Sequence, residues 1–151
     1  MTTYNAGYTG RLLEAEVLPQ CTDTLTCHLP YKVAMARVRM NQPAGWNPKD
    51  PASKCMNNFH TLVAEALETT DYSELKLFSA VGSPLDFFHG VDAFFEFQGR
   101  IVTIDVTKNP HKLEGKADFI LQECVLEDEI ALQAYAEGIA KCFSKRVQAA
   151  A

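Results

Sequence analysis

The chain has 151 residues, of which 47% are hydrophobic and 22% charged, and its formal net charge is −5. This length and balance predict one soluble globular domain, residues 1–151, with a substantial buried core. The acidic excess argues against a protein that binds DNA non-specifically through a basic surface. It does not exclude a nucleic-acid partner, because the carboxylates that bind a metal ion themselves add to the negative charge of the chain.

No apolar run approaches the roughly 18 residues that a membrane helix needs, so we expect no membrane partner. The N-terminus shows no basic stretch followed by an apolar one, which argues against a secretory signal. Five cysteines occur without a CxxC spacing, which favours a reduced, cytoplasmic chain with free thiols. Cys21, Cys27 and His28 lack the second ligand pair of a common zinc site, and no phosphate-cradling glycine loop is present.

The first third of the chain gives few structural signals. Residues 8–18 fit a short helix that ends at Pro19, and residues 32–40 fit either a helix or a buried strand. Residues 41–51 form a proline-rich loop, in which the ring of Trp46 is expected to fold back onto the core. We expect residues 1–52 to form an N-terminal extension that packs on a core made of residues 53–148.

An amphipathic helix is predicted over residues 51–68. Asp50 suits the N-cap and Pro51 the first helical position. Glu65 and Glu68 lie off the apolar stripe of this helix. The apolar side chains that recur at helical spacing are Met56, Phe59, Val63 and Ala66.

The second half of the chain is rich in strand signals. Apolar, β-branched and aromatic residues predict strands over 75–81, 91–97 and 100–107, and a short fourth strand over 118–122. A last helix over 127–147 carries its acids early and its bases late, as the helix dipole favours. The pattern predicts an α+β fold in which a small mixed β-sheet is flanked by helices.

The turn between the second and third strands sets their register. Gly99 suits a two-residue loop, Gln98-Gly99, between the two strands. Counting back from the loop, pair by pair, brings Asp92 opposite Asp105. Strict alternation places both acids on the side away from the main core. The core side is expected to carry Val91, Ala93, Phe95, Phe97, Val102, Ile104 and Val106.

Two opposed carboxylates have Cβ atoms roughly 4.5–5.5 Å apart, and they destabilise a hairpin unless a positive group lies between them. Oxygen ligands suit a hard cation, and two carboxylates are a usual protein contribution to a magnesium site. Aspartates that are solvated or paired with lysine or arginine stay an alternative. Aromatic residues around the hairpin can stack on bases, although core packing explains most of them: Phe87, Phe88, Phe94, Phe95 and Phe97.

Residues 90–108, GVDAFFEFQGRIVTIDVTK, resemble the core of the PD-(D/E)xK nuclease superfamily. In that superfamily an aspartate opens one strand of a hairpin, and the next strand carries an acid, one intervening residue and a lysine. The resemblance covers about residues 54–122. It implies a restriction-endonuclease-like core with the element order α-β-β-β-α-β, and DNA as the substrate.

By this resemblance, Asp92 and Asp105 bind Mg²⁺ or Mn²⁺, and Lys108 orients the attacking water or stabilises charge on the phosphate. Glu65 assists from the upstream helix, with Glu68 as the alternative, and either acid also fits a solvated helix surface. Asp86, in the approach to the hairpin, is either a supporting acid or a turn former, and we expect the turn.

The sequence departs from the superfamily pattern at Thr107, which stands where the lysine is expected; Lys108 follows one position later. The first hypothesis is therefore a magnesium-dependent deoxyribonuclease that hydrolyses phosphodiester bonds. The second is a catalytically inactive nuclease-like fold that serves as a nucleic-acid- or protein-binding accessory module. The third is an unrelated α+β protein that self-associates, and a homodimer stays open under each hypothesis.

Overall fold

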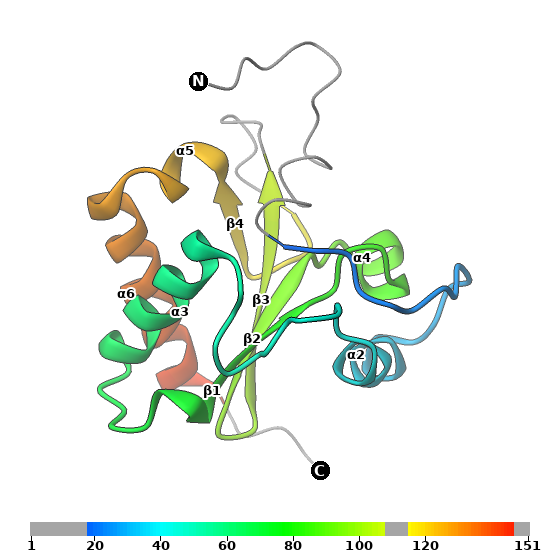
Figure 1. Ribbon diagram of the computed structural model, residues 1–151, viewed down its shortest axis with the longest axis horizontal. Helices are drawn as coiled ribbons and strands as arrows, with labels where there is room; N and C mark the ends of the chain where they lie inside the picture. Colours follow the sequence, from blue (N-terminus) through cyan, green and yellow to red (C-terminus); the bar gives the residue numbers. More distant parts are fainter. Residues whose placement is uncertain (1–17, 108–114, 147–151) are drawn as a thin grey trace.

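The computed structural model describes residues 18–107 and 115–146, which form an α+β fold around a four-stranded sheet (Figure 1). The strands are β1 (Leu75–Ser79), β2 (Ala93–Phe97), β3 (Arg100–Thr107) and β4 (Phe119–Gln122). The helices are α2 (Tyr31–Met40), α3 (Lys54–Ala66), η1 (Tyr72–Glu74, a 3-10 helix), α4 (Pro84–His89), α5 (Glu123–Leu126) and α6 (Glu129–Lys145).

Each strand pairs with the next one along the chain, in the order β1-β2-β3-β4. Strand β2 runs antiparallel to both β1 and β3, whereas β4 runs parallel to β3. Strands β1, β3 and β4 therefore point the same way, and their last residues meet beside the first residue of β2. We call this region the carboxyl end of the sheet; it is bounded by Ser79, Ala93, Thr107 and Gln122.

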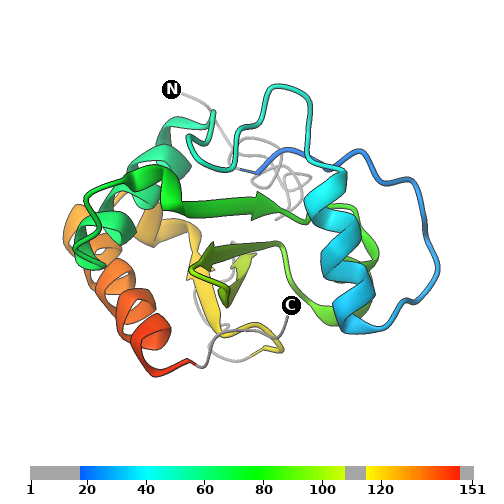
Figure 2. The same cartoon turned by 90° about the horizontal axis from the view of Figure 1, so that it is seen from below.

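Helices cover both faces of the sheet (Figure 2). Helices α3 and α6 pack together on one face, and α2 with α4 lies on the other. The first face holds the larger core, in which the rings of Phe59 and Phe95 meet edge to face at 5.4 Å. The strand residues buried there are Leu75, Leu77, Ala93, Phe95, Phe97, Val102, Ile104, Val106 and Leu121. Removing this apolar surface from water is the main source of stability for the fold.

The second face has a smaller core of its own. It includes Val91, so the prediction that Val91 faces the main core was wrong: Val91 precedes β2, and strand alternation does not hold there. Phe78 and Phe94, with ring centroids 5.1 Å apart, pack beneath the buried side of α2, which presents Ala34, Met35 and Val38. Strand β2 is thus covered on both faces, which explains why its sequence is nearly continuous in apolar residues rather than alternating. No helix within residues 18–107 and 115–146 combines the length and apolar character that crossing a membrane requires.

The predicted strands and long helices are present, with shifts at their ends. Residues 32–40 form a helix, which settles the ambiguity of that segment, and residues 8–17 lie outside the described part. The indole of Trp46 folds back as expected, because it is buried and its Nε1 donates to the carbonyl oxygen of Leu77 at 2.9 Å. The predicted helix start at Pro51 was wrong: Ser53 is the N-cap, and its hydroxyl accepts from the Met56 amide.

Helix α4 was not predicted. Its start combines a side-chain cap from Ser83 with Pro84 in the first turn, a pattern that the sequence analysis took for a simple turn. The order of elements also differs from α-β-β-β-α-β. Helix α4 lies between β1 and β2, helices α5 and α6 follow β4, and residues 115–118, the described part of the β3–β4 connection, hold no helix.

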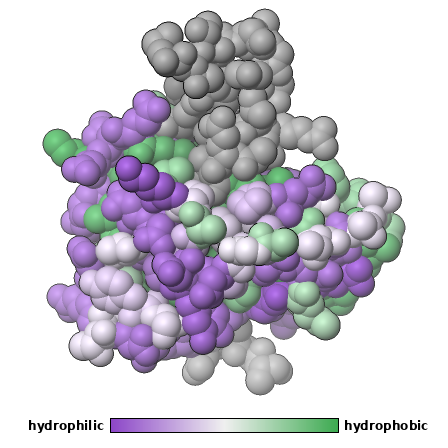
Figure 3. Space-filling model, viewed as in Figure 1, coloured by the Kyte–Doolittle hydropathy of each residue, from purple (hydrophilic) through white to green (hydrophobic). Residues whose placement is uncertain are grey.

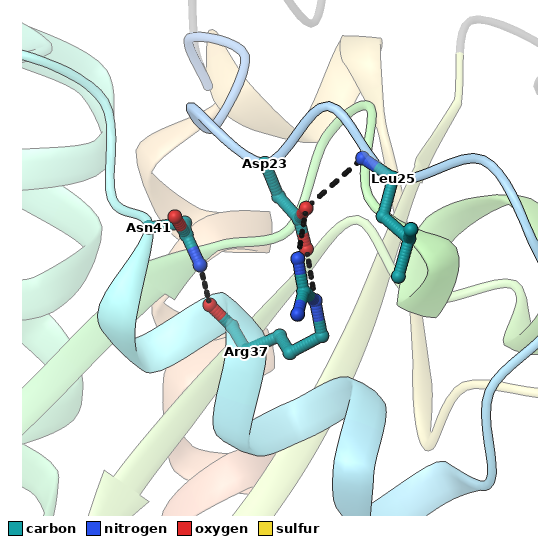
Figure 4. A network of polar contacts seen from close by, with 4 residues as sticks. All are labelled: Asp23, Leu25, Arg37 and Asn41. Atoms are coloured by element: carbon teal, nitrogen blue, oxygen red, sulfur yellow. Dashed lines mark hydrogen bonds and ion pairs between the residues drawn. The ribbon is translucent and has the colours of Figure 1, made fainter.

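A buried acid ties the segment before α2 to that helix (Figure 4). The Asp23 carboxylate accepts hydrogen bonds from Arg37 Nε at 2.9 Å, from Arg37 Nη2 at 2.8 Å and from the Leu25 amide at 3.0 Å. The side chain of Asp23 is 1% exposed, and that of Arg37 is 41% exposed. The hydrogen bonds from Arg37 are the largest cause that lowers the pKa of Asp23 below its ordinary value.

Replacing Asp23 by asparagine should lower the free energy of unfolding at pH 7 by about 1–3 kcal/mol, because charge-assisted hydrogen bonds are lost. A carboxylate whose pKa is lowered by folding stabilises above its unfolded pKa, near 4, and this stabilisation is lost as the pH falls through the folded value. The difference between wild type and Asp23→Asn in urea denaturation should therefore shrink from pH 7 to pH 3. A difference that is constant over this range would contradict the assignment.

The β2–β3 turn has the predicted two-residue loop. Gln98 and Gly99 have φ angles of 51° and 75°, and Phe97 pairs with Arg100 across the turn. Two successive positive φ angles are typical of a type I′ turn, which favours asparagine then glycine.

Glutamine at the first position is strained, so Gln98→Asn should raise the free energy of unfolding by about 0.5 kcal/mol. Gly99→Ala should lower it by about 1–2 kcal/mol, since a Cβ at positive φ is disfavoured. Thermal or urea unfolding of both variants measures this contrast. Equal effects of the same sign would show that the turn geometry does not limit stability.

Candidate functional site

The two aspartates singled out by the sequence lie at the carboxyl end of the sheet. The β2–β3 ladder runs from the turn to the pair Ala93–Ile104, which is the predicted register. Asp92 comes directly before the last paired residue of β2, and Asp105 directly after its partner on β3. The register thus brings the two acids to adjacent positions where antiparallel pairing ends.

Asp92 is only 2% exposed, and hydrogen bonds hold both its backbone and its side chain. Its amide donates to the carbonyl oxygen of Ile104 at 2.9 Å, and its carbonyl oxygen accepts from the Ala80 amide at 2.8 Å. Its carboxylate Oδ2 accepts from the Val106 amide at 2.7 Å. The side chain therefore completes the hydrogen bonding of β3 at a point beyond the last residue of β2, where a strand carbonyl is missing.

The Val106 amide is the peptide group that joins Asp105 to Val106. The Asp92 carboxylate consequently lies against the backbone of Asp105. The side chain of Asp105 is half-buried, and alternation along β3 places it on the same face as Thr103 and Thr107. Asp92 and Asp105 are thus close, but the ladder ends at Ala93–Ile104, one pair short of the predicted Asp92–Asp105 pair, and Asp92 reaches the backbone of β3 through its carboxylate.

The sequence analysis missed a second carboxylate that acts in the same way. Asp118 precedes β4, and its Oδ2 accepts from the Thr103 amide at 2.9 Å and from the Thr103 hydroxyl at 3.1 Å. Its Oδ1 accepts from Arg146 Nη2 at 2.6 Å. An aspartate immediately before a predicted strand is the signal shared by Asp92 and Asp118, although the sequence alone does not show which amide each will reach.

The other predicted site residues are distributed differently. Thr107 is the last residue of β3, at the carboxyl end, and Lys108 lies outside the described residues. Glu65 is exposed near the end of α3, where it lines a shallow surface with Glu137 and Lys141 of α6. That part of α3 is near the β2–β3 turn, because a neighbouring hollow is lined by both Glu68 and Gln98.

Glu65 is therefore not brought to the two aspartates, which lie at the opposite end of the hairpin. Five residues of β2 separate these ends, a distance of about 17 Å. The expectation that Asp86 forms a simple turn was wrong. Asp86 lies in the first turn of α4, where its amide donates to the Ser83 hydroxyl at 3.4 Å and its Oδ2 accepts from the Gly82 amide at 2.9 Å.

The carboxylates of Asp92 and Asp105 fit a magnesium or manganese ion in part. Mg²⁺ is usually bound through one or two carboxylates and keeps several waters. A carboxylate has about four lone-pair sites, and Asp92 uses one of them for the hydrogen bond from Val106. Within the described ranges, no three His, Cys, Asp or Glu side chains are grouped as a metal centre.

Comparison with known proteins leaves the site to be judged on its own geometry. No family model, no curated protein and no solved structure matches this chain.

Asp92→Ala should lower the free energy of unfolding by about 1–3 kcal/mol, because it leaves the buried Val106 amide without this acceptor. Asp92→Asn keeps a side-chain oxygen at the same place and should cost much less. Urea denaturation of both variants separates the structural role of Asp92 from any role that needs its charge. Equal losses for the two variants would show that the hydrogen bond to Val106 is not what stabilises this end of the sheet.

Proposed function

We propose that the protein hydrolyses phosphodiester bonds in DNA with the help of a divalent cation, as an endonuclease-like domain of the PD-(D/E)xK type. The proposal combines the sequence resemblance with one structural observation. The Asp92 carboxylate accepts a hydrogen bond from the Val106 amide, which follows Asp105 in the chain. Asp92 therefore lies against the backbone of Asp105. The α+β fold with a mixed sheet is compatible with such a domain.

Asp92 and Asp105 would hold Mg²⁺ or Mn²⁺. A bound ion of this kind supplies activation of water and neutralises charge that develops on the phosphate. The contribution of the chain itself is to fix the two carboxylates. Asp105 sits within the regular part of β3, paired with Ile120 of β4, and Asp92 is fixed by both its backbone and its side chain. In the proposal Lys108, which follows Thr107 in the sequence, orients the water.

An inactive accessory module is the second candidate, and Thr107 favours it. The position two residues after Asp105 carries a hydroxyl where the motif has an ammonium group. A domain that keeps both acids but lacks a positioned lysine binds a cation without efficient hydrolysis. The two functions therefore differ in turnover rather than in metal affinity.

The deciding experiment incubates the protein with supercoiled plasmid and with linear DNA, in Mg²⁺, in Mn²⁺ and in EDTA. Cleavage should require the cation, and Asp105→Asn should lower the rate by roughly 100-fold or more, because a charged ligand is lost. Glu65→Gln is the matched control, since this acid is exposed and lies at the other end of the hairpin. Its cleavage rate should equal that of the wild type.

Thermal unfolding with increasing Mn²⁺ gives an independent measure of binding, because a ligand that binds the native state raises its stability. Wild type should be stabilised and Asp105→Asn should not. Stabilisation without cleavage assigns the accessory role. Cleavage that persists undiminished in Asp105→Asn would exclude the proposed site.

A further inference from the structure

A cluster of aromatic rings lies beside the carboxyl end of the sheet. The ring of His28 has its centroid 5.5 Å from that of Phe88 and 5.4 Å from that of His89, and the ring of Tyr31 lies 5.5 Å from His89. We call these four residues the aromatic platform. They come from three segments: the loop before α2, the first residue of α2, and the end of α4.

The aromatic platform reaches the surface, and the rings of His28, Tyr31 and His89 carry polar atoms. His28 is exposed, Tyr31 is 43% exposed, and Phe88 and His89 are half-buried. His89 is fixed, because its Nε2 lies 2.7 Å from the carbonyl oxygen of Leu29 and so ties the loop to α4. The face shown in Figure 3 is mostly hydrophilic, with apolar residues in small scattered groups. Three of the four rings carry polar atoms, whereas the exposed side chains of Val33 on α2 and Phe87 on α4 do not.

Cationic groups border the aromatic platform. Lys116 Nζ lies 3.4 Å from the carbonyl oxygen of Phe88, and the Lys116 side chain runs along Gly90. Lys32 follows Tyr31 on α2 and is exposed. Burial is the largest cause that raises the pKa of Tyr31, and the negative charge of Asp118 is the second. Asp118 is paired with Arg146 at 2.6 Å, so its charge is offset.

The aromatic platform lies close in the chain to the proposed site, of which Asp92 is 2% exposed and Asp105 half-buried. Two residues, Gly90 and Val91, separate His89 from Asp92, so the two Cα atoms lie within about 11 Å of each other. That distance corresponds to about three stacked nucleotides at 3.4 Å per step. A strand whose bases rest on the rings would thus present a nearby phosphate to the two aspartates.

We propose that the aromatic platform binds unpaired bases, and that the ligand of this domain is single-stranded DNA or DNA with an unpaired segment. This inference rests on the proposed function and names its substrate class. Stacking on aromatic rings needs an open base face, which a duplex hides inside its helix. The neighbouring lysines supply the attraction for the phosphate backbone.

Binding is measured by fluorescence anisotropy in EDTA, so that neither metal nor cleavage is involved. The probes are a labelled mixed-sequence 15-nucleotide single strand and its blunt duplex. The single strand should bind at least roughly ten-fold more tightly than the duplex, and the double variant His28→Ala/Tyr31→Ala should remove this difference. Tyr31→Phe, which keeps a stacking ring, should bind as the wild type does.

Tyr72→Ala is the matched control, because Tyr72 is 39% exposed but belongs to η1, directly before β1 and at the other end of the sheet. Its affinity for the single strand should be unchanged. Thermal unfolding verifies that each variant is folded, and His28→Ala alone replaces the double variant if that one is not. Equal affinities for single strand and duplex, or full affinity in the folded platform variants, would overturn the inference.

The two proposals fail separately. Preference for the single strand without metal-dependent cleavage leaves the aromatic platform standing and removes the nuclease. Metal-dependent cleavage together with equal affinities for single strand and duplex leaves the nuclease standing and removes the inference.

Discussion

Hydrogen bonding at the carboxyl end of the sheet depends on one constraint: a buried backbone amide needs an acceptor even where its partner strand has ended. Strand β3 extends beyond β2, and the Asp92 carboxylate takes the place of the missing carbonyl at Val106. Asp118 does the same for Thr103 on the other side of β3, before β4 begins. Two acids therefore complete the central strand, one on each side.

This constraint gives Asp92 two roles that are separable by chemistry. As an acceptor for an amide, it needs only an oxygen at the correct place. As a ligand for a cation, it needs its negative charge as well. Asp105 is held differently, because the ladder to β4 positions its backbone opposite Ile120.

The carboxyl end also collects segments that are far apart in the sequence. Helix α4 fills the connection between β1 and β2, and its last turn carries Phe88 and His89 to the surface beside Asp92. The hydrogen bond from His89 to the Leu29 carbonyl and the ion pair between Asp23 and Arg37 both fix the segment that precedes α2. The opposite end of the sheet is closed by the tight turn at Gln98 and Gly99. The two ends are thus built differently, and only one gathers candidate ligand-binding groups.

The sequence by itself determined the hairpin. The glycine after Gln98 defines a two-residue loop, and the period of two in a strand carries that register along both strands as far as the pair Ala93–Ile104. It also determined the α+β class and the burial of the Trp46 ring, because apolar periodicity and the hydrophobic character of a side chain are local signals.

Only the tertiary structure decided which side chains complete β3, where Glu65 lies and which rings form the aromatic platform. An open amide at Val106 appears only once strands of unequal length are paired, and the position of Glu65 near the turn follows from how α3 packs against the sheet. His28, Tyr31 and His89 are brought together by packing between segments that are up to about sixty residues apart in the chain. No local pattern encodes such a contact, since it depends on how helices of fixed length fit across a sheet.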